Sequence, residues 1–202
     1  MPLTSLDERD LLLPLAEGIR EDPMWETFLR RLRQRTEATW ACLLVQMTPT
    51  AHLPPITRTS SERADLPDPD FDQLSRLGLI PYASLRPNRV YALEEMLNFA
   101  DPEAPNRQRA ALKAARIAHA RFIRIVSRAE NNAWIILLSE RRSFDADDSS
   151  LLSSLAPHLA VALDTLVTSK VNSVMMGKSG QGITLNLSNN AQVALDDVVQ
   201  VM

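Results

Sequence analysis

The sequence is poor in cysteine, glycine and aromatic residues, and it contains no long hydrophobic run. Cys42 is the only cysteine among 202 residues, which excludes a disulfide within the chain and a multi-cysteine zinc site. No apolar run approaches the roughly 20 residues that cross a bilayer, and the opening segment MPLTSLDERD is acidic where a signal peptide is basic. These features predict a cytoplasmic protein that does not contact a membrane.

A strong charge of one sign is also lacking. The formal net charge is −3, so the composition shows no basic excess of the kind that marks a nucleic-acid surface. Hydrophobic residues make up 45% of the chain and charged residues 23%, as in an ordinary globular protein. A chain of this length is expected to form one sizeable domain with extensions.

The clearest secondary-structure pattern lies between residues 119 and 167. Residues 121–128 and 133–140 are rich in β-branched and aromatic residues, and the polar segment between them has the length of a hairpin turn. Both runs carry consecutive apolar residues, which predicts an antiparallel pair covered on both faces. Asp145 and Asp148 then have the spacing of a capping box, and leucines recur after them at helical spacing. We expect that helix to cover one face of the sheet.

Three further strands are expected earlier in the chain. Their segments combine β-branched and apolar residues with turn residues on either side, and they lie at residues 39–48, 56–60 and 89–93. The pattern therefore predicts an α+β domain whose five-stranded, mostly antiparallel sheet is flanked by helices.

Helices are expected before, within and after these strands. Asp22 and Pro23 have the residue types of a cap and a first helical turn, and an apolar face follows them. Gly78 is expected to end a short helix that begins at Phe71. The remaining predicted helical segments are residues 6–20, 94–98 and 107–117.

Several segments together resemble a known family. They are DPMWETFLRRL at residues 22–32, LRPNRVYALEEML at 85–97, HARFIRIV at 119–126 and AWIILLSERRSFDADDSSLLSSLAPHLAVAL at 133–163. They resemble the N-terminal sensory region of bacterial LuxR-type helix-turn-helix regulators that carry a GAF/PAS-like domain. The tyrosine, tryptophan and aspartate spacing of the acyl-homoserine-lactone-binding subgroup is not found here. The resemblance implies a sensor and leaves its signal open.

The C-terminal part is expected to extend beyond this sensory domain. We assign residues 1–168 to a GAF/PAS-like domain with N-terminal helices, and residues 169–182 to a helical extension and linker. Residues 183–202 show a strand, an Asn189-Asn190 turn, a second strand and the start of a helix, which resembles a truncated second PAS-like domain. The resemblance implies that the DNA-binding domain lies outside this chain.

Apolar side chains recur along the expected long C-terminal helix. This stripe predicts a partner helix, and therefore a homodimer. A lone hairpin after the helix is marginal in water, so we expect it to pair with the main sheet, pair with another subunit, or remain mobile. The predicted dimerisation residues are Leu159, Leu163, Val167, Val171 and Val174.

No convergent set of catalytic or metal-binding residues is recognisable. The segment GKSGQG lacks the earlier glycine of a phosphate-binding loop, because Asn172 occupies that position. His52, His119 and His158 are far apart and have no cysteine or carboxylate at a metal-ligand interval. Cys42 lies in an apolar strand, where burial raises a thiol pKa and disfavours a nucleophile. We therefore predict a protein that is not an enzyme and holds no metal and no cofactor.

Residues in and beside the predicted strands are the candidate ligand contacts. Sensor domains of this class bind small molecules between the sheet and its covering helices, in mainly apolar pockets. The candidates are Trp40, Cys42, Tyr82, Tyr91, Phe122 and Trp134. Aromatic residues in strands are more often part of the core, so a filled core is the alternative.

These observations predict the ligand-sensing and dimerisation domain of a bacterial transcriptional regulator. An unidentified small molecule would change the packing of the last helix, and DNA would be bound only through a domain outside this chain. Such a ligand must bind the two helix arrangements with unequal affinity. The alternative is a ligand-free scaffold or dimerisation module of a signalling protein.

Overall fold

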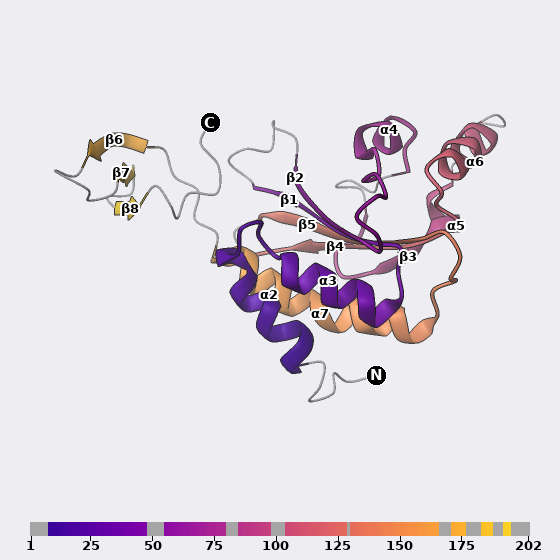
Figure 1. Ribbon diagram of the computed structural model, residues 1–202, viewed down its shortest axis with the longest axis horizontal. Coiled ribbons are helices and arrows are strands. Elements are labelled where there is room, and N and C mark those ends of the chain that lie inside the picture. Colours follow the sequence, from indigo (N-terminus) through magenta and orange to yellow (C-terminus); the bar gives the residue numbers. More distant parts are fainter. Residues whose placement is uncertain are drawn as a thin grey trace. The chain divides into compact units, whose positions relative to one another are not determined.

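The computed structural model divides into two compact units, Met1–Thr165 (unit 1) and Leu166–Met202 (unit 2). The residues that it describes are 8–47, 55–79, 85–97, 104–128, 130–165, 171–176, 183–187 and 192–194. Unit 1 contains a five-stranded sheet with helices on both faces (Figure 1), and unit 2 contains a three-stranded sheet.

The sheet of unit 1 is antiparallel throughout. Its strands are β1 (Trp40–Gln46), β2 (Ile56–Ser61), β3 (Val90–Ala92), β4 (His119–Val126) and β5 (Asn132–Ser139), in the order β2-β1-β5-β4-β3. Strands β1 and β5 are buried at nearly every position, which explains their continuous apolar runs, because side chains point alternately to two covered faces. The predicted α+β fold with a five-stranded antiparallel sheet is confirmed.

One face of the sheet is covered by the N-terminal helical segments and the last helix of unit 1 (Figure 1). Apolar residues on these helices pack against alternate residues of β1, β4 and β5, among them Leu43, Ile123 and Ile135, which are fully buried. The elements are η1 (Glu8–Leu12), α2 (Leu13–Glu17), η2 (Gly18–Arg20), α3 (Glu26–Thr36) and α7 (Ala146–Asp164).

The opposite face is covered by three helices (Figure 1), namely α4 (Phe71–Arg76), α5 (Leu93–Met96) and α6 (Ala104–Ala114), of which α4 and α5 are short. Gly78 follows α4 with a positive φ of 68°, as expected for a glycine after a helix end. Among the described residues, no helix of either face is both long and apolar enough to cross a bilayer.

The start of α7 is held by the predicted capping box. The Asp145 side chain accepts hydrogen bonds from the backbone N–H groups of Asp147 and Asp148, and Asp148 accepts from the Asp145 N–H at 2.9 Å. Arg142 donates to Asp148 at 2.7 Å and to the Thr36 carbonyl at 2.8 Å, which joins the start of α7 to the end of α3. The sequence prediction for this helix start is confirmed.

Helix α3 begins later than predicted. We expected Pro23 in its first turn with Asp22 as cap, but the helix starts at Glu26 and no side chain caps it. Trp25 precedes it with a left-handed φ of 59°, and its buried indole donates to the Leu15 carbonyl at 3.0 Å. Burial of this large side chain against α2 outweighs the local preference for a proline-led start.

Unit 2 differs from its prediction in one respect. Its strands are β6 (Val171–Met176), β7 (Ile183–Leu187) and β8 (Gln192–Ala194), paired in the order β6-β7-β8. The strands of the predicted hairpin are confirmed, but the helix predicted to continue through residues 169–176 is wrong, because Val171–Met176 form a strand. Pairing with β7 satisfies the backbone of a segment whose valines, asparagine and serine are weak helix formers. The hairpin therefore pairs with β6, which we did not anticipate.

Substitution of Gly18 by alanine is expected to destabilise unit 1 by about 1–3 kcal/mol, the usual cost of overpacking a core. A Cβ atom at this position would lie 2.6 Å from Cδ1 and 3.1 Å from Cα of Trp25. Urea unfolding measures the change in the free energy of unfolding. Gly78→Ala is the control, because its Cβ meets no atom within 4 Å and only the positive φ is strained. Unchanged stability of the Gly18→Ala protein would contradict this packing.

Candidate ligand-binding site

A row of side chains crosses the sheet on the face covered by α4, α5 and α6. Strand register aligns Thr59 of β2, Cys42 of β1, Ile136 of β5, Phe122 of β4 and Tyr91 of β3. Directly paired residues lie on the same face, and neighbouring strands are about 4.8 Å apart. The row therefore runs from one edge of the sheet to the other beneath the short helices.

The structure brings most of the predicted ligand contacts together. Trp40, Cys42, Tyr91, Phe122 and Trp134 are buried in one hydrophobic cluster on this face, and Tyr82 lies outside the described residues. The Tyr91 hydroxyl accepts a hydrogen bond from the Arg86 backbone at 3.1 Å, and the Arg89 guanidinium lies 4.3 Å from the ring centroid. The Tyr91 hydroxyl on β3 therefore already has a hydrogen-bond partner in the neighbouring loop.

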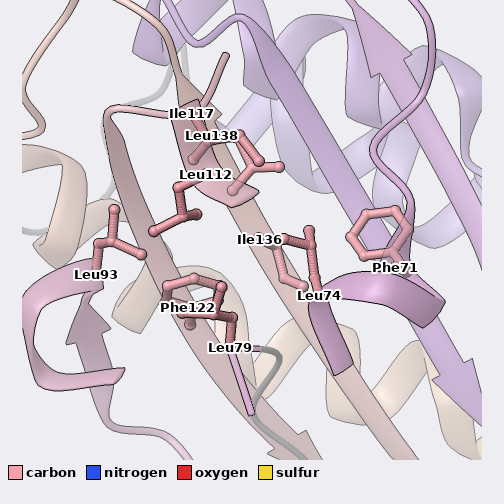
Figure 2. Close-up of a pocket in the computed structure, with 9 residues that line it drawn as sticks. All are labelled: Phe71, Leu74, Leu79, Leu93, Leu112, Ile117, Phe122, Ile136 and Leu138. Atoms are coloured by element: carbon pink, nitrogen blue, oxygen red, sulfur yellow. The ribbon is translucent and has the colours of Figure 1, made fainter. Parts of the chain in front are cut away.

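A small apolar cavity lies between the sheet and the short helices (Figure 2). Its volume is about 10 Å³, close to the minimum that one water molecule needs. Hydrocarbon side chains from α4, α5, α6, the sheet and the segments that follow α4 and α6 form its whole lining, so no polar partner would hold a water there. We call this space the apolar cavity; its lining residues are Phe71, Leu74, Leu79, Leu93, Leu112, Ile117, Phe122, Ile136 and Leu138.

A second, larger space lies beside strand β2. Its volume is about 500 Å³, which is within the usual range for small-molecule sites of roughly 300–1,000 Å³. It is open to solvent and carries three carboxylates and one guanidinium. We call this space the polar hollow; its lining residues are Thr57, Arg58, Thr59, Asp68, Pro69, Asp70, Phe71 and Asp72.

Phe71 lines both spaces. It is the first residue of α4, and its ring is half-buried. Figure 2 shows the ring beside Leu74 and Ile136, two residues of the apolar cavity. On the sheet, the row described above places Thr59 in the polar hollow and Ile136 in the apolar cavity, with Cys42 between them.

Cys42 is electrostatically coupled to the polar hollow although it is fully buried. Burial raises the pKa of its thiol far above the usual range, a hydrogen bond with the Thr59 side chain opposes that rise, and the charge of Asp68 adds to it. The thiol is therefore neutral at physiological pH, and its environment excludes the thiolate that nucleophilic catalysis requires.

Helix α4 is positioned by two polar contacts. The Asp70 side chain accepts a hydrogen bond from the Gln73 backbone N–H at 2.9 Å, which caps the start of the helix. Gln108 of α6 donates from its side chain to the Leu77 carbonyl at 2.7 Å, which ties the end of α4 to α6. These contacts fix the helix backbone and leave the Phe71 ring to packing alone.

Trp40 brings an indole N–H to the same face of the sheet. It pairs with Leu138, which lines the apolar cavity, and only 2% of its surface is exposed. Within the part of the chain that the structure describes, the Trp40 Nε1 atom is buried without a hydrogen-bond partner. Buried donors are satisfied in most native proteins, so this N–H is available to an acceptor that enters the site.

The predicted dimerisation residues do not form one helix face. Leu159 and Leu163 of α7 are fully buried inside unit 1, because they pack toward the sheet. Val171 and Val174 belong to strand β6, and Val167 lies outside the described residues. The apolar spacing that suggested a partner helix has two separate origins, a buried helix face and a strand.

Sequence reasoning missed the residues that the short helices contribute to the cavity. We selected aromatic residues in and near strands, whereas most of the lining is leucine and isoleucine. Phe71 and Leu74 are three positions apart on α4, which places them on one helix face, and this spacing was the available signal. Among the described residues no group of three or more histidine, cysteine, aspartate or glutamate side chains could hold a metal ion.

The Cys42 thiol of the folded protein is expected to be almost unreactive toward thiol reagents at pH 8, because burial both raises its pKa and excludes the reagent. Labelling with 4,4′-dithiodipyridine, followed by absorbance, measures the rate. Urea-unfolded protein is the control and should react with one equivalent rapidly, since Cys42 is the only thiol. Rapid labelling under native conditions would show that this face of the sheet is open.

The chain matches several solved structures. SdiA in complex with octanoyl-rac-glycerol matches with a TM-score of 0.53 and 14% identity, over 86% of this chain and 74% of that chain. The VqsR LBD domain from Pseudomonas aeruginosa matches with a TM-score of 0.48 and 17% identity, over 80% of this chain and 96% of that chain. CepR2 from Burkholderia cenocepacia, an N-acylhomoserine lactone dependent LuxR family transcription factor, has a TM-score of 0.47 and 14% identity, over 80% and 95%.

No curated protein matches the sequence. A family model described as FlgD Tudor-like domain matches residues 44–199, from within β1 to beyond β8. This match covers more than half of the chain and includes strands of both units. The chain therefore belongs to the FlgD Tudor-like domain family.

Proposed function

We propose that unit 1 is the GAF/PAS-like, ligand-sensing domain of a LuxR-type transcriptional regulator. The sequence segments of residues 22–32, 85–97 and 119–163 support the proposal by their resemblance to such regulators. The fold supports it as well, because it is similar to that of SdiA, whose structure contains octanoyl-rac-glycerol. The domain acts by binding and not by catalysis.

The unequal cover of the two sheet faces is the observation that carries the proposal. Helices α3 and α7, of 11 and 19 residues, pack on one face, whereas the other face is covered by α4 and α5, of 6 and 4 residues, and by α6, of 11. Short helices make few contacts of their own, so their displacement disturbs less of the core. The face under α4, α5 and α6 can therefore open for a ligand while the other face stays packed.

The lining of the two spaces indicates a small amphiphile. The apolar cavity suits a hydrocarbon tail, and the polar hollow suits a hydrophilic head group. Asp68, Asp70 and Asp72 outnumber Arg58 around the hollow, so an anionic head would be repelled. We infer a ligand whose head group is not anionic, and the Trp40 N–H can donate to a carbonyl of its acyl chain.

Signalling would follow from a change in how unit 1 packs. We propose that the regulator is a cytoplasmic homodimer and that its DNA-binding domain lies outside this chain. A ligand shifts such a protein only by the difference in its affinity for two arrangements. In the ligand-free arrangement the cavity, at about 10 Å³, is too small for a ligand. Opening of the α4 side of the sheet gives a second arrangement that can hold one.

A ligand-free scaffold is the second candidate function. The nearly filled core under α4, α5 and α6 favours it, because a cavity of about 10 Å³ holds no organic molecule. A scaffold would need no opening of this face, and unit 1 would then serve assembly alone. Direct binding measurements separate the two functions.

Octanoyl-rac-glycerol is expected to bind unit 1 of the full chain more tightly than octanoate, by roughly tenfold, or about 1.4 kcal/mol. The tails are identical and the heads differ in charge, so the comparison tests the polar hollow. Isothermal titration calorimetry gives both Kd values. At roughly 100 times the Kd, binding should stabilise the protein by about 2.7 kcal/mol, which raises Tm by roughly 5–10 °C. Binding of neither compound would favour the scaffold.

Glutamate at Leu13 or Val161 is expected to convert a dimer to a monomer. These large hydrophobic residues are 51% and 64% exposed, and they lie on α2 and α7, which contact each other. Burial of such residues in a dimer would make an added charge costly. Light scattering at several concentrations measures the mass. Ala114→Glu, at an exposed position of α6 on the other side of the sheet, is the control. A wild-type chain that stays monomeric at high concentration would contradict the homodimer.

A further inference from the structure

One side chain separates the polar hollow from the apolar cavity. Phe71 belongs to the lining of both, and no other residue does. On the sheet side, Thr59 lines the hollow and Ile136 lines the cavity, and Cys42 of β1 lies in the row between them. Two strand spacings, roughly 10 Å, therefore divide the two spaces along the sheet. We expect a passage from one to the other to run past the Phe71 ring, over the part of the sheet where Cys42 lies.

We propose that Phe71 is the gate of the ligand site, and that its ring moves aside to admit the hydrocarbon tail of an amphiphile from the polar hollow into the apolar cavity. This inference rests on the proposed sensing function and adds the route of entry to it. The head group stays in the hollow beside Thr59 and Asp68, and the tail crosses over Cys42 toward Ile136.

The position of Phe71 means that moving its ring aside costs little free energy. The ring is half-buried, in contrast to Leu74 and Leu79 beside it, which are 5% and 2% exposed. The cap of α4 is made by the Asp70 side chain with the Gln73 backbone, so the Phe71 side chain has no part in it. Rotation about its side-chain bonds can thus open the passage without breaking a hydrogen bond of the helix.

The same packing keeps the gate closed without a ligand. A displaced ring would expose the hydrocarbon lining of the cavity to the water of the polar hollow, and burial of apolar surface favours the closed position. The cavity behind the ring, at about 10 Å³, offers water no polar partner. A tail that fills the space replaces the contacts that the ring gives up, so the open position is populated with ligand bound.

Cys42 is a natural reporter of this gate. It is fully buried, it is the only thiol of the chain, and it lies under the passage. Phe71→Ala removes the ring and should open a path from the polar hollow to the thiol. We expect labelling of Cys42 by 4,4′-dithiodipyridine to become at least tenfold faster than in the wild-type chain at equal free energy of unfolding.

Leu77→Ala is the matched control. Leu77 follows α4 directly, is also half-buried against the same core, and lines neither space. This variant loses packing under α4 but keeps the ring, so its labelling should change only as far as its unfolding free energy, measured in urea, predicts. Equal labelling rates in the Phe71→Ala and Leu77→Ala proteins, after that correction, would overturn the gate.

A ligand experiment separates failure of the gate from failure of the proposed function. Octanoyl-rac-glycerol should associate with the Phe71→Ala protein at least tenfold faster than with wild type in stopped-flow tryptophan fluorescence, and it should protect Cys42 from labelling. Binding to wild type with an unchanged association rate in the variant would overturn the gate and leave sensing intact. Fast labelling of the variant together with no binding to either protein would support the gate and count against sensing.

Discussion

Burial of β1 and β5 on both faces is the constraint on which unit 1 depends. Every residue from Trp40 to Val45 is buried, and so are those from Ala133 to Ser139, so neither face of the sheet can be left to solvent. An exposed face would place large aromatic and aliphatic side chains in water. The helical segments before β1, those between β2 and β4, and α7 after β5 together meet this requirement. The proposed ligand site lies under the cover that includes the two short helices α4 and α5.

The helices on one face of the sheet stabilise unit 1, and those on the other face can rearrange. Arg142 joins the start of α7 to the end of α3 through Asp148 and the Thr36 carbonyl, so these two helices are fastened at one end. No comparable charged contact joins the described residues of α4 to the sheet, and its polar tie is the bond from Gln108 to Leu77. A core packed firmly on one side tolerates rearrangement on the other, which suits a protein that must respond and stay folded.

Much of the fold followed from local patterns, and the errors have physical causes. The strands at β4 and β5 and the Asp145 cap were predictable because hydrophobic runs and capping residues act over a few positions. The start of α3 was misplaced because Trp25 is buried by contacts with α2, ten residues away. The segment of strand β6 resembles a helix in sequence because Val171 and Val174, three positions apart, fit the helical period. Of the candidate residues that the structure describes, Phe122 alone lines the apolar cavity. Its aliphatic lining was not predicted, because Leu74 and Leu79 meet the sheet only after α4 folds back upon it.

Strand β2 is an edge strand of the sheet, and its composition affects whether the chain pairs with another copy. In the described sheet its outer edge has no neighbouring strand, and a bare edge is a template for pairing with another chain. Its six residues, ITRTSS, carry four hydroxyl groups and a guanidinium. These side chains bind water along the open backbone and disfavour the flat, dry contact that aggregating strands require. The same short segment that lines the polar hollow therefore also disfavours edge-to-edge association with another chain.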